Sequence, residues 1–151
     1  RSRWSPSDAM SGDHTALEHT ATARVRYGET DQMGVVYHAN YLSFFEIART
    51  ELIRLRGVAY SSLEEGGLRL MVTEAAMQYH SPGRYDDVLA ITARLSESGP
   101  ARVRFDYKVR REGEDEVLVT GHTVLASIAE DGRPCRMPAE LREIFDQDSG
   151  E

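Results

Sequence analysis

One segment of the sequence, Asn40–Arg56, has the pattern of a helix that the rest of the chain must surround. Its apolar residues recur at intervals of three and four, and in its first half they occupy most of the helix circumference. A helix that is apolar nearly all round is buried in a protein core. We expect Asn40 to be the N-cap and Gly57 to end the helix. The sequence therefore predicts one long, buried helix.

The loop before this helix, Tyr27–His38, carries the side chains of a candidate site. It places Tyr27, Asp31 and His38 around Gly34, a residue that favours tight turns. The N-terminus of a helix presents N–H groups without partners and the positive end of the helix dipole. Such an end suits a carboxylate, or a carbonyl oxygen that becomes negatively charged. We therefore expect the functional site where this loop enters the helix.

The other segments have the pattern of strands joined by short turns. Alternating residues predict one strand before the loop and four after the helix: Thr20–Tyr27, Leu70–His80, Asp87–Leu95, Ala101–Arg111 and Val117–Ile128. A short closing helix is expected at Pro138–Phe145. Because short turns join antiparallel neighbours, the sequence predicts an α+β fold with one antiparallel sheet of roughly five strands. The charged residues that alternate along Ala101–Arg111 are expected to form its solvated face.

Length and composition limit the classes of function. The chain has 151 residues, of which 40% are hydrophobic and 28% charged, as in an ordinary globular domain. We expect this domain over residues 20–147, between a flexible extension (1–19) and a short tail (148–151). A net charge of −7 argues against a nucleic-acid-binding protein, which needs a basic face. The single cysteine, Cys135, and the lack of a long apolar run predict a cytoplasmic protein without membrane insertion.

The candidate site also carries a family resemblance. The motif YGETDQMGVVYHANY (Tyr27–Tyr41), followed by Phe44, Glu46 and Ala48–Arg49, resembles the 4-hydroxybenzoyl-CoA thioesterase family. Within it the chain is most similar to the YbgC-type acyl-CoA thioesterases of the Tol–Pal cluster. Weaker matches follow at Tyr79, Pro82, Arg84, Asp86–Asp87 and residues 133–138. The resemblance implies a hotdog fold, in which a sheet wraps a central helix, and hydrolysis of an acyl-CoA to free acid and CoA.

The resemblance also implies roles for single residues. The family's catalytic carboxylate matches Asp31, which either attacks the thioester carbonyl or activates a water molecule; both routes stay open. The position matching His38 brings a backbone N–H to that carbonyl, and close relatives carry a tyrosine matching Tyr27, so both are candidate catalytic residues. The candidates for substrate binding are Gly34, Val35, Val36, Tyr37 and Asn40. The family builds this site at a homodimer interface, and its dimers often pair into tetramers.

An acidic protein that binds CoA needs a local group of basic residues for the phosphates. Arg133 and Arg136 flank a turn that contains Pro134, and we predict that they contact the phosphates. Arg84, Arg102 and Arg104 are further candidates. No group of His, Cys and carboxylate residues has metal-ligand spacing, so neither a metal nor a cofactor is expected.

Alternatives remain at this point. Glu46 is the second candidate for the catalytic carboxylate, because another thioesterase branch with this fold takes its carboxylate from the helix. A simpler role for Glu46 is an ion pair with Arg49, one helical turn later. The chain is alternatively a hydratase or dehydratase using His38 with Glu46, a thioesterase for carrier-protein thioesters, or a non-catalytic acyl-binding module. The identity of the acyl group is open.

Overall fold

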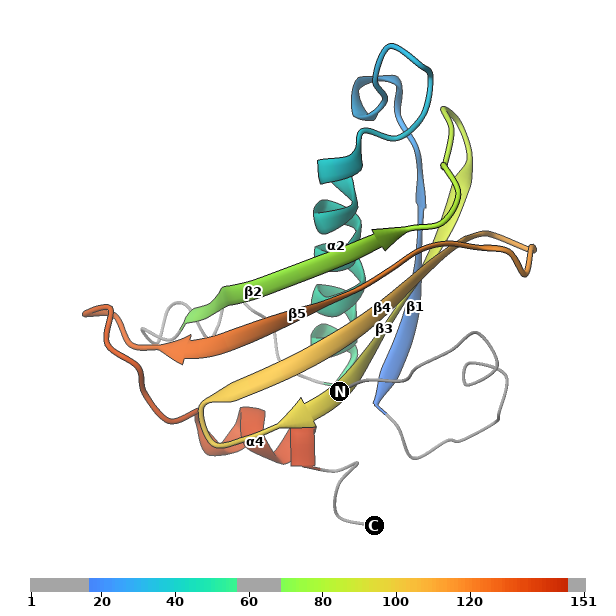
Figure 1. The fold of residues 1–151 in the computed structure, drawn as a ribbon. Coiled ribbons are helices and arrows are strands. Elements are labelled where there is room, and N and C mark those ends of the chain that lie inside the picture. The colour runs from blue at the N-terminus through green and yellow to red at the C-terminus, as the bar shows by residue number, and fades with distance from the viewer. Residues whose placement is uncertain (1–16, 57–68, 147–151) are drawn as a thin grey trace.

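The computed structural model describes residues 17–56 and 69–146. Within these ranges the chain forms five strands and two α-helices, arranged as one sheet crossed by one long helix (Figure 1). Their bounds are β1 (Glu18–Arg24), α2 (Tyr41–Leu55), β2 (Arg69–Tyr79), β3 (Val88–Ser98), β4 (Arg102–Arg111), β5 (Val117–Ile128) and α4 (Ala139–Asp146). The predicted strands and both helices are confirmed, with ends that differ by at most three residues.

The order of the strands in the sheet is β1-β3-β4-β5-β2, and all neighbours are antiparallel. Short turns join β3 to β4 and β4 to β5, as the sequence predicts. The strand before α2 lies at one edge of the sheet, and the strand after it, β2, lies at the other. Apart from two half-buried residues, the residues of β2 are exposed. One edge of the sheet therefore presents a long strand that pairs on one side only.

The helix α2 packs through an aromatic contact in the middle of the sheet. The ring of Phe45 stacks on the ring of Tyr107, with centroids 4.2 Å apart and planes at 2°. Next to it, a β-carbon added to Gly121 would lie 2.8 Å from the same Phe45 ring. The absence of a side chain at Gly121 therefore lets the helix lie this close to the strands.

The face of α2 that points away from the sheet is not covered in the single chain. Leu42 and Ile47 are 39% and 38% exposed, and Glu46 lies on the same exposed side. The prediction of a helix buried nearly all round is therefore wrong for the described chain. The physical reason is that one sheet covers only one side of a helix.

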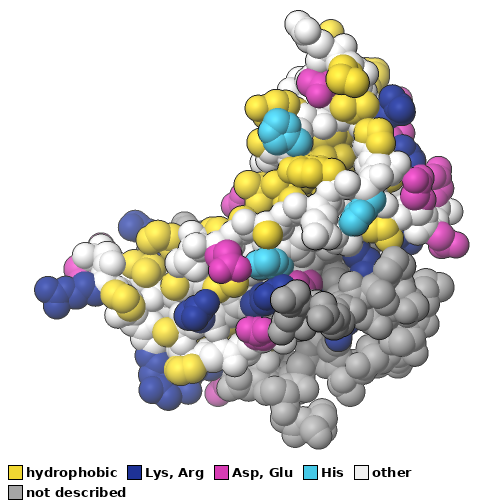
Figure 2. Space-filling view, in the orientation of Figure 1, with side chains coloured by type: hydrophobic (Ala, Val, Ile, Leu, Met, Phe, Trp, Pro, Cys, Tyr) yellow, Lys and Arg dark blue, Asp and Glu magenta, His cyan; other side chains and the backbone are white. Residues whose placement is uncertain are grey.

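The outer face of the sheet also differs from its predicted form. Arg102 at the start of β4 is exposed, but Asp106 and Lys108 are only 5% and 1% exposed. β4 is the central strand, so side chains of β3 and β5 flank its own on both sides. Charged and histidine side chains gather over the middle of this face (Figure 2). Arg104 forms an ion pair with Asp106 at 3.2 Å, and His122 Nε2 makes a hydrogen bond of 2.6 Å with Glu74 Oε2. The expected solvated face is therefore wrong for the middle of β4.

The packed core includes a residue before Thr20, the predicted start of the domain. Leu17 is 1% exposed and belongs to the core, and His19 Nε2 lies 2.9 Å from Glu51 Oε1 of α2. Residues 1–16, 147–151 and the expected helix stop at Gly57 lie outside the described residues. Within the described ranges, no helix has the length and apolar character needed to cross a bilayer.

Replacing Gly121 by alanine is expected to lower the free energy of unfolding by about 1–3 kcal/mol. The added β-carbon would lie 2.5 Å from the Ala76 carbonyl oxygen as well as against the Phe45 ring. Urea unfolding at one protein concentration measures the change. Gly28→Ala is the control, since a β-carbon there meets no atom within 4 Å, and it should stay within about 0.5 kcal/mol of the parent. An equal effect of the two changes would contradict the close approach at Gly121.

Candidate active site

The loop that the sequence singles out is a miniature hairpin. Thr30 and Val36 form an isolated bridge, and the Asp31 N–H donates to the Val35 carbonyl at 2.9 Å. The turn closes when the Gly34 N–H donates to the Asp31 carbonyl at 3.0 Å. Gly34 has a φ of 78°, a conformation that glycine adopts without steric cost. The predicted turn at Gly34 is thus confirmed, and Asp31 stands at its first position.

Asp31 uses its side chain to stabilise this turn. Its Oδ1 accepts a hydrogen bond from the Met33 N–H at 2.9 Å, the usual contact of a turn-forming aspartate. No other contact of the carboxylate is found within the described chain, and Asp31 is half-buried. The backbone therefore fixes one carboxylate oxygen and leaves Oδ2 available to a ligand.

His38 stands where the loop becomes a helix. A 3₁₀ turn over His38–Asn40 leads directly into α2. The imidazole of His38 is exposed and lies against the ring of Tyr37, with centroids 4.5 Å apart. The His38 carbonyl accepts a hydrogen bond from the Tyr79 hydroxyl at 3.1 Å. The edge strand β2 therefore helps to position this turn. Its Asn40 N–H donates to the Tyr37 carbonyl at 2.9 Å, while the N–H groups of His38 and Ala39 precede the first intrahelical bond.

Asn40 has a different role from the predicted helix cap. Its φ and ψ of −72° and −15° are already helical, and its side chain makes no capping bond. The side-chain Nδ2 instead donates to the Glu29 carbonyl at 2.9 Å. The predicted N-cap position is therefore confirmed, but the Asn40 side chain does not cap the helix. Its amide instead ties the start of the loop to the start of the helix.

The remaining predicted residues lie around this hairpin at different depths. Tyr27 is 79% exposed, and its ring meets that of Tyr85 edge-on at 5.8 Å. Tyr37 is 46% exposed, whereas Val36 is 4% exposed and belongs to the core. Val35 is half-buried. One end of the molecule therefore carries Tyr27, Asp31, Tyr37 and His38. The buried side chain of Val36 attaches the hairpin to the core.

The two predicted phosphate contacts lie elsewhere. The Met137 N–H donates to the Pro100 carbonyl at 2.9 Å, and the Cys135 N–H to the Ser127 carbonyl at 2.9 Å. These bonds place residues 133–137, which include Arg133 and Arg136, beside the turn between β3 and β4. That turn lies at the opposite end of the sheet from the hairpin before α2 (Figure 1). The structure does not bring these arginines to Asp31 within one chain.

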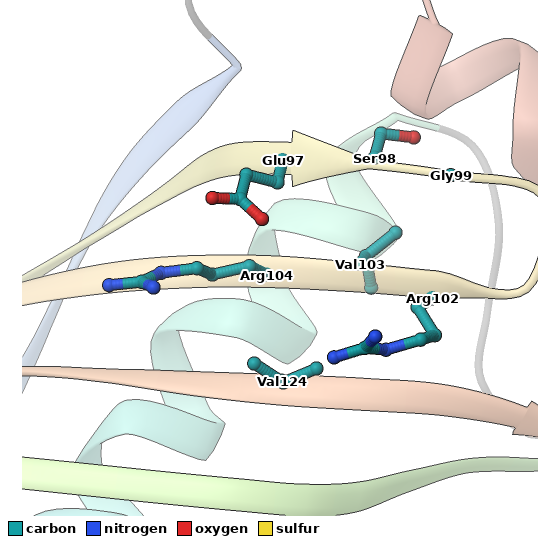
Figure 3. A pocket seen from close by; sticks show the side chains of 7 residues that line it. All are labelled: Glu97, Ser98, Gly99, Arg102, Val103, Arg104 and Val124. Carbon is teal, nitrogen blue, oxygen red and sulfur yellow. The ribbon is translucent and has the colours of Figure 1, made fainter. Parts of the chain in front are cut away.

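A cavity of about 140 Å³ opens beside the same β3–β4 turn. Figure 3 shows the side chains of Arg102 and Arg104 along β4 and that of Glu97 on β3 around it. Val124 of β5 adds an apolar wall. The end of the sheet opposite Asp31 therefore holds a basic cavity next to the segment of Arg133 and Arg136.

The second candidate carboxylate, Glu46, lies on the uncovered face of α2. Its expected ion-pair partner points the other way: Arg49 is 6% exposed and donates to the Tyr107 hydroxyl at 3.1 Å. Burial raises the pKa of Tyr107 above its ordinary value. The prediction of a Glu46–Arg49 ion pair is therefore wrong, since the sheet beneath the helix supplies Arg49 with a buried hydroxyl acceptor.

The sequence did not predict two tyrosine hydroxyls, of Tyr41 and Tyr79, that bond segments next to the hairpin. The hydroxyl of Tyr41 accepts a hydrogen bond from the Gly83 N–H at 3.1 Å, and burial raises the pKa of Tyr41. Tyr79 contacts His38 from β2. Both tyrosines occupy apolar positions in their helix and strand patterns, so only their places in the family matches hinted at a role. Among the described residues, no three His, Cys, Asp or Glu side chains gather as metal ligands.

A long helix against a five-stranded antiparallel sheet, with a polar hairpin at the helix N-terminus, defines a hotdog-fold protein. The structure of a DHNA-CoA thioesterase from Staphylococcus aureus superimposes with a TM-score of 0.84 at 29% identity, over 87% of this chain and 91% of that one. The structure of a 4-hydroxybenzoyl-CoA thioesterase, 19% identical, shares the fold with a TM-score of 0.77 over 86% of this chain and 99% of its own.

Sequence comparison gives the family. Residues 25–145 match the thioesterase-like superfamily, and the chain belongs to it. The acyl-CoA thioesterase YbgC of Haemophilus influenzae is 35% identical over 125 residues, which cover 81% of this chain and 90% of that protein. The resemblance to the YbgC-type thioesterases is therefore confirmed.

Asn40→Ala is expected to lower the free energy of unfolding by about 1 kcal/mol, because the Glu29 carbonyl loses a donor in a half-buried place. Faster amide hydrogen exchange near Glu29 should accompany the loss. Gln32→Ala, an exposed change in the same hairpin, is the control and should stay within about 0.5 kcal/mol of the parent. Equal unfolding free energies for parent and Asn40→Ala would show that the amide does not secure the loop.

Proposed function

We propose that this protein is an acyl-CoA thioesterase, which hydrolyses the thioester bond of an acyl-CoA to a free acid and CoA. One observation carries the proposal: a tight hairpin holds the Asp31 carboxylate beside the N-terminus of a long helix. A thioester needs an attacking oxygen and a stabiliser for the negative charge that develops on its carbonyl oxygen. The hairpin offers the first and the helix entrance the second. The CoA thioesterases among the similar proteins support the same reaction.

In the proposed reaction, Asp31 acts through the carboxylate oxygen that its turn leaves available. It either attacks the carbonyl carbon, giving a mixed anhydride that water then hydrolyses, or takes a proton from an attacking water. The sulfur leaves as the CoA thiolate. The N–H groups of His38 and Ala39 stabilise the carbonyl oxygen; one such donor contributes about 3–4 kcal/mol to lowering a barrier of this kind. The His38 imidazole and the Tyr27 hydroxyl stand at the same end, within reach of the acyl group.

The proposed enzyme is a homodimer, with the site at the interface. Two surfaces support this: the uncovered face of α2, and the edge strand β2, where Met71 and Tyr79 are each 49% exposed. An edge strand with unpaired N–H and C=O groups is a natural place for a second chain. Because Tyr79 of that edge bonds His38, the interface would adjoin the site. We propose that these dimers pair again into a tetramer.

The basic end of the sheet suits the phosphates of CoA. We propose that Arg133 and Arg136 contact them, with the cavity of Arg102 and Arg104 nearby. Because this end lies away from Asp31 within one chain, the contacting arginines would come from another subunit. The substrate carries its own activated bond, so the proposed reaction needs no cofactor. A single cysteine supports a cytoplasmic location.

The first prediction concerns the carboxylate. Asp31→Asn should lower kcat for CoA release from acyl-CoA esters by at least about 100-fold, as for removal of a catalytic base. A chromogenic thiol reagent measures release across short, long and aromatic esters, with a blank for Cys135. Asp115→Asn, which changes an exposed carboxylate in the β4–β5 turn, should remain within about twofold of the parent.

Three outcomes would change the proposal. Activity that survives in Asp31→Asn but disappears in Glu46→Gln would give the carboxylate role to Glu46. Release from a carrier-protein thioester alone would change the substrate. Ligand binding without turnover on any thioester would indicate an acyl-binding module.

A second prediction concerns the phosphates. Arg136→Ala should raise KM for an acyl-CoA by about tenfold, because a charge-assisted contact to phosphate is lost. It should leave KM unchanged for the same acyl group on N-acetylcysteamine, a thiol without the nucleotide. Arg110→Ala, which removes an arginine bonded to the Glu114 carbonyl, is the control. An unchanged KM for acyl-CoA in Arg136→Ala would remove Arg136 from the binding site.

A further inference from the structure

The hairpin of Asp31 rests on a second loop, Ser81–Asp87, which we name the backing loop. The Val36 N–H donates to the Gly83 carbonyl at 2.8 Å, and the Tyr85 N–H donates to the Gly34 carbonyl at 3.3 Å. Val35 and Arg84 form an isolated bridge between the same two segments. The hairpin therefore takes its position from the backing loop, through backbone contacts on the strand that also bonds the Asp31 N–H.

One arginine side chain fastens both ends of the backing loop. Arg111, the last residue of β4, donates from Nη2 to the Pro82 carbonyl at 2.8 Å and from Nε to Asp87 Oδ2 at 3.0 Å. The same Asp87 oxygen accepts the Arg84 N–H at 2.8 Å. A guanidinium presents its donors in a rigid planar fork, so one side chain fixes the spacing between Pro82 and Asp87.

Among the ion pairs of Arg111, the pair with Asp87 is the shortest and the most buried. Both side chains are half-buried, at 21% and 24% exposure, and a charge-assisted hydrogen bond in such surroundings is stronger than a neutral one. The carboxylates of Glu114 and Glu116 lie farther off, at 3.6 Å and 3.4 Å, and are more than half exposed. Hydrogen bonding to Asp87 raises the pKa of Arg111, so the fork stays charged.

We propose that Arg111 is a positioning residue for the reaction at Asp31. It holds the backing loop, and that loop holds the hairpin against the helix entrance. The proposal rests on the proposed function, because it assigns Arg111 an effect on a step that Asp31 performs. In this role, Arg111 itself contacts neither the substrate nor the reacting atoms. Displacing a catalytic group by about 1 Å can lower the reaction rate roughly 100-fold. Loosening the backing loop should therefore lower kcat.

The test compares kcat, KM and unfolding temperature for variants of Arg111 on the ester that the parent hydrolyses best. Arg111→Gln, which loses the charge and the fork, should lower kcat by at least about tenfold, with KM within about threefold of the parent. Arg111→Lys keeps the charge and one donor, and should recover part of kcat. The matched control is Arg24→Gln, which removes another arginine contact to the backing loop, an exposed pair with Asp86; its kcat should stay within about twofold.

A double variant separates positioning from general stabilisation. In an Asp31→Asn background, Arg111→Gln should change the residual rate by less than about twofold, since the group it positions is already gone. An equal loss in both backgrounds, or a lower unfolding temperature with an unchanged kcat, would overturn the proposal. If Arg111→Gln does not fold, Asp87→Asn gives the same test from the other partner, because it keeps an acceptor for the Arg84 N–H but loses the charge.

The two proposals fail separately. Full activity in Asp31→Asn would remove the catalytic role of Asp31 whatever Arg111 does. A large loss in Asp31→Asn with normal kcat in Arg111→Gln would keep the proposed function and overturn the positioning role alone.

Discussion

The close approach of α2 to the sheet at Phe45, Tyr107 and Gly121 is the constraint on which the rest of the structure depends. The stacked rings of Phe45 and Tyr107 set the distance between the helix and the sheet, and the lack of a side chain at Gly121 permits this short distance. Because the helix cannot slide or lift without losing this contact, its N-terminal turn has a defined place above one end of the sheet. Close packing of the helix against the sheet thus fixes the position of the residues that lead into the helix.

The Asp31 hairpin is then held by groups from three other elements: the start of α2, the edge strand β2 and the backing loop. The amide of Asn40 ties its start to the helix, and the hydroxyl of Tyr79 on the edge strand bonds the His38 carbonyl at its end. The backing loop bonds its second strand through the backbone. Most of these contacts use backbone atoms of the hairpin, so they set its shape without occupying its exposed side chains. Such support leaves Asp31 and His38 free to meet a substrate.

Local pattern predicted the elements of this fold because each was strongly periodic; Val103, Phe105 and Tyr107 alternate as clearly as a half-buried strand allows. The motif also predicted the site loop and its turn at Gly34. It could not give the role of Asn40, whose acceptor is a carbonyl brought close only by the folded loop. Nor could it show that Leu42 and Ile47 remain uncovered, because an apolar helical position does not say which chain covers it. Helical spacing suggested Glu46 as the partner of Arg49, and no local pattern gave Arg111 a partner in the backing loop. The Tyr107 hydroxyl that Arg49 bonds, and the Pro82 and Asp87 oxygens that Arg111 bonds, belong to segments far along the sequence.

The edge strand β2 has a consequence for how the newly made chain behaves. It is eleven residues long, pairs on one side only, and carries exposed Met71 and Val72. Edges of this kind recruit strands indiscriminately and seed aggregation. A newly made chain whose β2 edge is not covered would therefore be prone to form insoluble cross-strand contacts with other chains. Because such contacts form between chains, the cellular concentration of the chain then influences the yield of soluble protein.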